Sequence, residues 1–410
     1  MNNSGLVVMM VGLLAACGSE PKGESAGDGS TGTTGVDAPT GTGGPEDSTG
    51  GPDEDSTGGP VGSTGEPGSS TGDDAGGDSG TGEPPGSWLP EPPVGPFTCT
   101  GARWVFTHDQ PSHVRELGLD PRQHLLVHEE HGLLDLDALG QLDVERVFDL
   151  SPWWQSSGPD GLGNWFMTTV EDNDSRRRWI HKFDVAGDPV WKVDLGLSPP
   201  ENSIDVMAIA VAPNGELVLT DDAFGLHRLS ADGEPLWDVK PADYLRIAAI
   251  NDAGEIVGLS PGGNPGVQVL NADGSLRWQF AWPQADGMYG RADINAAGEV
   301  VAGATWSGVP IKRFSAAGEL LWQREYSFMP DAILLDQLAF NDAGEIAVAG
   351  HTFDPPSALV IKLDPQGEPV ATHRCSEGSV LTAITIDAAG AIYAGGSIND
   401  GGLPFVAAFD

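Results

Sequence analysis

A short phrase, Asn/Asp/Ser-x-x-Gly-Glu, recurs through the last three-quarters of the chain in two alternating contexts. In one context it precedes an apolar run, as in "NDAGEIVG" from Asn251 and "NDAGEIAVAG" from Asn341. In the other it precedes a tryptophan, as in "SADGEPLW" from Ser230. Asn, Asp and Ser start such bends by bonding backbone groups, and Gly takes the left-handed conformation of a hairpin. Two kinds of hairpin in succession, each returning after about 45 residues, predict a β-propeller of four-stranded blades.

The number of hairpins predicts the number of blades. "LGLDPRQHLLV" from Leu117 is a degenerate first hairpin, and the intact copies have the turn glycines Gly163, Gly215, Gly254, Gly298, Gly344 and Gly390. The second hairpin occurs only six times, because the chain ends on "LPFVAAFD" with no strand after it. "GARWVFTH" from Gly101 resembles the missing strand, so we expect Arg103 to His108 to pair with the carboxyl-terminal strand. The predicted fold is an all-β, seven-bladed propeller over residues 98–410, closed by its N-terminal strand.

Two sets of repeat positions are expected to hold the blades together. In the first hairpins, a positive φ is expected at Gly215, Gly254, Gly298 and Gly344. On the outermost strands, tryptophan follows the turn glycine by four residues or stands in the matching place of the closing strand, at Trp104, Trp191, Trp237, Trp278 and Trp322. We expect each indole to pack between blades and to bond a neighbouring turn. A ligand-binding aromatic cage is the alternative.

The N-terminal residues have the features of an export signal. An apolar stretch from Leu6 to Ala16 is too short to span a bilayer. The residues Leu14 to Cys17 resemble the lipobox of bacterial lipoproteins, which implies signal cleavage and lipidation of Cys17. An ordinary secretory signal cut near Ala16 is the alternative, since no Lys or Arg precedes the apolar stretch. By resemblance to sorting signals we expect an outer-membrane lipoprotein, periplasmic or surface-exposed.

A polar linker separates this signal from the propeller. Residues 18–97 are dominated by Gly, Ser, Thr, Asp and Pro, with 15 acidic residues and one basic residue. This segment has few large apolar side chains, and the surface they could bury is too small to offset the conformational entropy lost on ordering. We therefore predict that the segment is disordered. The segment is either a tether that holds the propeller away from a membrane or a solvated tail without a further role.

The remaining cysteines, Cys99 and Cys375, both lie near the predicted ring closure. A disulfide between them would attach the N-terminal strand to the ring, and an exported chain permits such oxidation. Two free thiols are the alternative.

Composition and motifs limit the chemistry. The 60 acidic and 20 basic residues give a formal net charge of −40, which excludes nucleic acid as a partner. "HEEH" at His128 to His131 lacks the i, i+4 spacing of zinc-protease helices, and the nearby His113 and His124 are interpreted as surface clustering. "EDND" at 171–174 lacks the spacing and glycine of a calcium loop.

Some polar residues remain as candidates for the channel mouth, but they form no recognisable catalytic order. They are Asp221, Asp222, His227 and Asp336. No catalytic residue, metal ligand or cofactor is therefore assigned.

The phrases "RLSADGEPLWDV", "VLNADGSLRWQF" and "RFSAAGELLWQR" resemble the tandem repeats of bacterial seven-bladed propeller-repeat proteins and of pyrroloquinoline-quinone-type propellers. Quinoprotein dehydrogenases also have a disulfide between adjacent cysteines, which has no counterpart here. A second likeness is to the propeller lipoprotein of the outer-membrane barrel-assembly machinery. That family uses its repeats as a docking scaffold and has one more blade.

Together these features predict a membrane-anchored extracytoplasmic lipoprotein whose acidic propeller is a monomeric binding or scaffolding module for a protein or glycan. The alternative is a metal- or quinone-dependent enzyme, an oxidoreductase or a lactonase-like hydrolase, with its site at the channel mouth. Three or more Asp, Glu, His or Asn side chains within metal distance at the axis would favour the enzyme. A channel plugged by Ala, Val and Ile would favour the scaffold.

Overall fold

The structure, a computed structural model, describes residues 97–410 with the exception of several short segments. These are 111, 131, 148–153, 171–176, 198–207, 222–224, 242–244, 261–265, 283–289, 305–308, 327–332, 353–355 and 399–401. The predicted signal segment with Cys17 and residues 18–96 of the predicted linker lie outside the described residues. Among the residues that are described, no helix has the length and apolar composition needed to cross a bilayer.

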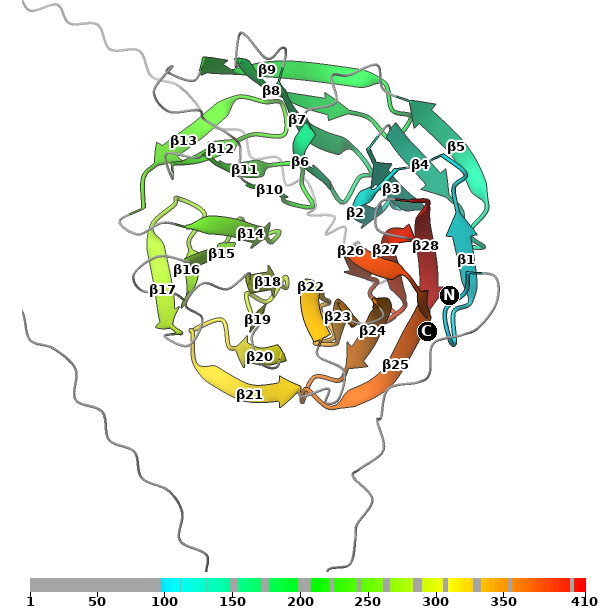
Figure 1. The fold of residues 1–410 in the computed structure, drawn as a ribbon. Coiled ribbons are helices and arrows are strands. Elements are labelled where there is room, and N and C mark those ends of the chain that lie inside the picture. Colours follow the sequence, from blue (N-terminus) through cyan, green and yellow to red (C-terminus); the bar gives the residue numbers. More distant parts are fainter. Residues whose placement is uncertain are drawn as a thin grey trace, which may run out of the picture. The chain divides into compact units, whose positions relative to one another are not determined.

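Seven four-stranded antiparallel sheets stand around a common centre, so the predicted seven-bladed propeller is confirmed (Figure 1). In each of the first six blades the strands follow in chain order from the centre outward. Blade 1 consists of β2 (Val114–Leu119), β3 (Leu125–Glu129), β4 (Gly132–Leu136) and β5 (Leu142–Val147). Blade 2 consists of β6 (Trp154–Pro159), β7 (Trp165–Val170), β8 (Arg177–Phe183) and β9 (Pro189–Leu197). Blade 3 consists of β10 (Ala208–Val211), β11 (Leu217–Thr220), β12 (Leu226–Leu229) and β13 (Pro235–Val239).

Blades 4 to 6 repeat the same order. Blade 4 consists of β14 (Arg246–Ile250), β15 (Ile256–Ser260), β16 (Gly266–Leu270) and β17 (Leu276–Ala281). Blade 5 consists of β18 (Gly290–Ile294), β19 (Val300–Ala304), β20 (Val309–Phe314) and β21 (Leu320–Tyr326). Blade 6 consists of β22 (Ile333–Phe340), β23 (Ile346–Thr352), β24 (Ser357–Leu363) and β25 (Pro369–Glu377). Blade 7 takes three strands from the carboxyl terminus and its outer strand from the other end of the domain: β26 (Ser379–Ile386), β27 (Ile392–Ile398), β28 (Pro404–Phe409) and β1 (Trp104–Thr107).

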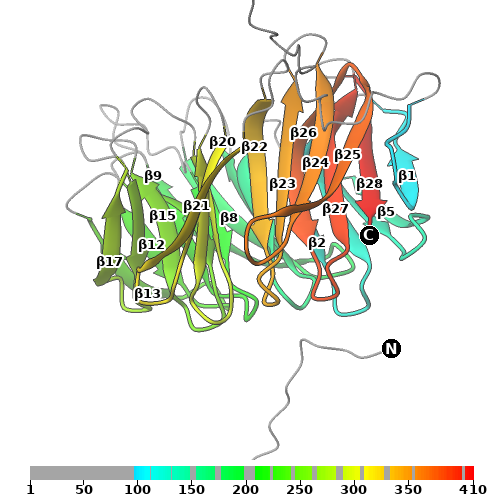
Figure 2. The same ribbon diagram turned by 90° about the horizontal axis from the view of Figure 1, so that it is seen from below.

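The ring is closed as the sequence predicts. β1 pairs antiparallel with β28, from Trp104 opposite Ala408 to Thr107 opposite Phe405. The two strands lie side by side in both views of the ribbon (Figures 1 and 2). Pairing with β1 covers the outer edge of β28, which would otherwise have unpaired backbone N–H and C=O groups.

The residues just before β1 attach to blade 6 as well. Thr100 donates its N–H to the carbonyl oxygen of Arg374 at 2.9 Å, and Ser376 donates its N–H to that of Thr98 at 3.0 Å. Between these bonds Cys99 and Cys375, both buried, form a disulfide. The N-terminal segment therefore pairs first with the outer strand of blade 6 and then with blade 7.

Two of the first hairpins connect adjacent blades through an asparagine, Asn251 in blade 4 and Asn341 in blade 6. In the turn after β22, Gly344 has φ of 84°, and its N–H donates to the carbonyl oxygen of Asn341 at 3.0 Å. The Asn341 side chain accepts the N–H of Glu345 at 2.9 Å and donates its own amide to the carbonyl oxygen of Asp387, in the next blade, at 3.0 Å. The repeated turn phrase thus builds both the hairpin and part of the contact between blades.

The apolar core lies between the sheets. Blades 5 and 6, for example, bury Ile311 and Val301 against Leu338 and Val348. Alternating side chains on a strand face opposite sides of its sheet, so each interior sheet has two apolar faces and needs a neighbour on both. A ring meets this need for every blade.

The central cavity, a candidate binding site

The repeated tryptophans lie at the outer edge of the ring and make the same contact in each of the five blades that have one, whereas blades 1 and 6 have Val144 and Ala371 at this position. Each indole Nε1 donates to a backbone carbonyl in the second turn of the following blade. The bonds run from Trp104 to Ala138 (3.2 Å), Trp191 to Ala231 (3.0 Å), Trp237 to Ala272 (2.9 Å), Trp278 to Ala316 (3.2 Å) and Trp322 to Pro365 (3.0 Å). These five side chains bridge blades and do not line the centre. The four glycines also have the left-handed conformation: φ is 86° at Gly215, 76° at Gly254, 78° at Gly298 and 84° at Gly344.

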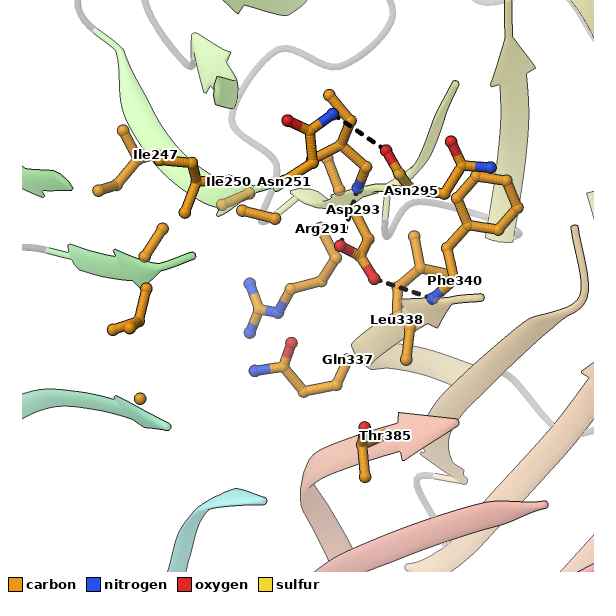
Figure 3. Close-up of a pocket in the computed structure, with 18 of the residues that line it drawn as sticks. Ile247, Ile250, Asn251, Arg291, Asp293, Asn295, Gln337, Leu338, Phe340 and Thr385 are labelled. Carbon is orange, nitrogen blue, oxygen red and sulfur yellow. Dashed lines mark hydrogen bonds between the residues drawn. The ribbon is translucent and has the colours of Figure 1, made fainter. Parts of the chain in front are cut away.

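The centre of the ring contains a cavity of about 970 Å³ that is lined by the innermost strands of all seven blades. This volume falls at the upper end of the range of small-molecule sites. Much of the lining is apolar, and includes Ile209, Val211 and Leu338. Figure 3 shows that Arg291 and Gln337 extend into this space from neighbouring strands. The channel is therefore neither plugged by small apolar side chains nor uniformly apolar.

Four polar side chains lie at one level of this cavity, and we call them the polar ring: Glu116, Arg246, Arg291 and Gln337. The strand register shows that these four residues lie at the same level. In each blade, the residue on the inner strand pairs with a residue on the second strand, and that partner stands five places after the left-handed residue of the turn. The pairs are Glu116 with His128, Arg246 with Leu259, Arg291 with Gly303 and Gln337 with Ala349, and the turn residues are Gln123, Gly254, Gly298 and Gly344.

Blades 3 and 7 have alanine at the same level. Ala208 pairs with Thr220, and Ala383 pairs with Gly395, again five places after the turn glycines Gly215 and Gly390. In blade 2 no pair is described at this level, because the side chains of residues 154–157 on its inner strand lie outside the described set. The polar ring is thus three adjacent polar side chains, on blades 4, 5 and 6, with an acid on blade 1 beyond the alanine of blade 7.

The two arginines of the polar ring repel each other. Burial lowers the pKa of Arg291 most, and the positive charge of Arg246 lowers it further. Arg291 donates Nε to the carbonyl oxygen of Asp336 and one terminal nitrogen to that of Gly290 at 3.1 Å. Within the described residues its second terminal nitrogen has no acceptor, and Arg246 has no ion-pair partner. Two guanidinium groups therefore retain N–H donors that face the cavity.

The acid of the polar ring has no ion-pair partner among the described residues. Burial inside the ring raises the pKa of Glu116 to about 7, while a backbone hydrogen bond from Leu117 and the positive charge of Arg291 lower it less. A carboxyl group in such surroundings gains from a cation or hydrogen-bond donor supplied by a ligand.

Asp293, two residues beyond Arg291 on β18, has a structural role. Its carboxylate accepts the N–H of Ile294 at 2.8 Å and, across the blade interface, that of Phe340 at 2.8 Å (Figure 3). Burial raises its pKa to about 7 in spite of these two bonds. Asp293 thereby connects blade 5 to blade 6 next to the polar ring.

The histidines of blade 1 do not gather into one site. His128 is buried against Trp165, and burial lowers its pKa to about 3. His124 contacts an oxygen of Asp135 at 2.8 Å, and with Asp143 these are the one group of described residues whose donor atoms lie close enough for a metal. Arg122 bonds the other Asp135 oxygen at 2.8 Å, so this carboxylate already has two partners. His131 and residues 171–174 are outside the described set.

The candidate residues for the channel mouth lie elsewhere. His227 contacts Asp221 at 2.8 Å and Asp238 at 2.7 Å, among the outer three strands of blade 3 and away from the cavity lining. The Asp336 carboxylate contacts His351 at 2.6 Å and is also absent from the lining, while Asp222 is not described. Sequence reasoning missed all four members of the polar ring.

No protein-family model matches the chain, and no curated protein matches it.

Proposed function

We propose that this chain is an exported, membrane-anchored lipoprotein whose propeller binds a ligand in its central cavity. The cavity is the observation that carries the binding function. It is lined by the inner strands of all seven blades and has the volume of a small-molecule site. Its lining is mixed polar and apolar, and among the polar groups Glu116 and Arg246 have no ion-pair partner within the described residues. Binding by a fixed ring of strands needs little reorganisation of the protein.

The disulfide supports the extracytoplasmic part of the proposal. Structural disulfides persist in oxidising compartments and are rare in the cytosol. Cys99 and Cys375 are bonded at the point where the N-terminal segment joins the ring. This agrees with the apolar segment and the lipobox-like residues that end at Cys17.

The geometry favours binding over the enzymatic alternative. The only described group with metal-binding spacing involves His124, Asp135 and Asp143, and none of these lines the cavity. Four acids do line it, each on a different blade: Glu116, Asp252, Asp293 and Asp342. Asp293 also accepts two backbone N–H groups.

Binding in the cavity is tested with a panel of free amino acids, short peptides and oligosaccharides, by the thermal unfolding of the full-length protein. The proposal predicts that at least one class raises Tm. It also predicts that Thr385→Phe, which fills part of the cavity, removes the shift (Figure 3). The same substitution at Thr372, on the outer strand β25, is the matched control and should retain the shift. A panel without effect, or an equal shift in both variants, would contradict cavity binding.

The anchor is tested by metabolic labelling with an alkyne-bearing fatty acid. The protein should incorporate the label and sediment with membranes, whereas Cys17→Ser should do neither. Label on Cys17→Ser, or secretion of the unaltered protein in soluble form, would contradict the lipid anchor.

A further inference from the structure

The polar ring places opposite charges on different parts of the cavity wall. Arg246 and Arg291 are on the adjacent blades 4 and 5, with Gln337 next to them on blade 6. Glu116 is on blade 1, separated from Gln337 by the blade whose residue at this level is Ala383. A positive arc and a negative group thus share one level of the cavity.

This charge pattern selects the ligand. A carboxylate fits a pair of guanidinium groups with free N–H donors, because such hydrogen bonds are charge-assisted and often bidentate. An ammonium group fits a carboxylate that has no ion-pair partner within the described residues. A simple anion would meet the field of a chain with net charge −40, whereas a neutral zwitterion would not.

We infer that the cavity binds a zwitterionic amino acid or short peptide, with its carboxylate on Arg246 and Arg291 and its ammonium group on Glu116. Gln337 is placed to bond the peptide unit, since its amide points into the cavity (Figure 3). The apolar lining from Ile209, Val211 and Leu338 receives the ligand's side chain. A volume of about 970 Å³ is large enough for a short peptide. This inference rests on the proposed binding function and names its ligand.

The test is calorimetric titration of the full-length protein with the dipeptide Ala-Leu and two blocked forms of it. N-acetyl-Ala-Leu lacks the ammonium group, and Ala-Leu amide lacks the carboxylate. We expect the free dipeptide to bind about tenfold tighter than either blocked form, which is the scale of one charge-assisted hydrogen bond. Equal affinities for all three, or no binding of the free dipeptide at millimolar concentration, would overturn the inference.

Single substitutions assign the two ends. Glu116→Gln should weaken Ala-Leu about tenfold and abolish the preference over the acetylated form. Arg246→Gln should reduce the preference over the amide, because only Arg291 then remains to bind the carboxylate. Two exposed residues serve as controls. Glu319→Gln lies on an outer turn, and Arg115→Gln lies next to the polar ring, where Arg115 pairs with Glu130 at 3.3 Å. Both control variants should bind Ala-Leu with the affinity of the unaltered protein. Unchanged selectivity in both test variants would overturn the assignment.

The outcomes also separate this inference from the proposed function. If another class of the panel raises Tm and Thr385→Phe removes the effect, the cavity is a binding site but the zwitterion is wrong. If no class raises Tm, the binding function itself fails.

Discussion

The outer and inner strands of this propeller follow opposite rules. On the outer strands the same side chain returns, and five tryptophans donate the same hydrogen bond to the next blade. On the inner strands one level of the cavity has Glu, Ala, Arg, Arg, Gln and Ala on the six blades that are described there. Repetition serves the contact between blades, which takes the same form in five of the seven blades. Departure from the repeat occurs where all blades face one shared space.

The largest effect is expected at the outer edge, from loss of the disulfide. Cys99→Ser with Cys375→Ser should lower the free energy of unfolding by about 3 to 5 kcal/mol, because the bond closes a very long loop. Urea unfolding, monitored by tryptophan fluorescence, measures it, with the unaltered protein under reducing conditions as the control. A change below about 1 kcal/mol would show that pairing of β1 alone holds the closure.

The next effect concerns the repeated tryptophan. Trp278→Ala should cost about 2 to 3 kcal/mol, since the half-buried indole packs against Phe314, with ring centroids 5.5 Å apart. Trp278→Phe retains part of this packing and should cost about 1 kcal/mol, the value of the lost N–H bond to Ala316. Both variants lack the indole N–H, so equal stability of the two would mean that packing against Phe314 contributes nothing measurable and would contradict the expected difference.

A turn glycine should matter less. Gly344→Val forces a β-branched residue to φ of 84°, and its Cβ would lie 2.8 Å from a terminal nitrogen of Arg313 in blade 5. We expect a loss of about 1 to 2 kcal/mol in unfolding free energy. Ala343→Val, at the exposed neighbouring position of the same turn, is the control and should change it by less than about 0.5 kcal/mol. Similar losses in both variants would contradict the conformational argument.

At the centre of the ring, the free energy of unfolding is expected to depend on pH. The folded pKa of Glu116 is raised from 4.5 to about 7, so between these values the folded state holds a proton that the unfolded chain has released. Stability therefore falls as pH rises from about 4.5 to 7. Glu116→Gln should make this fall in stability smaller. Part of the fall should persist in the variant, because burial also raises the pKa of Asp293 to about 7. Parallel stability curves for the two proteins between pH 4.5 and 8 would contradict the shift.

The fold was predictable because its determinants are local and repeated. The turn phrase specifies the hairpins, and the unmatched ends, "GARWVFTH" and "LPFVAAFD", specify the closure that β1 and β28 form.

The polar ring was harder to predict, since it depends on comparing blades. Glu116, Arg291 and Gln337 each stand seven residues before their turn residue, at 123, 298 and 344, so aligned blades would have revealed three members. Arg246 stands eight residues before Gly254, and a bulge between Ile247 and Ala249 brings it into the same register. That bulge has no marker in the sequence.

The most direct measurement replaces the whole polar ring with the residue that blades 3 and 7 already have. The variant Glu116→Ala, Arg246→Ala, Arg291→Ala, Gln337→Ala is compared with the unaltered protein in urea unfolding and in Ala-Leu titration. If the repeat holds the fold and the departures from it bind the ligand, unfolding free energy changes by less than about 2 kcal/mol and binding is lost. An unfolded variant, or one that still binds Ala-Leu with full affinity, would contradict that division of labour.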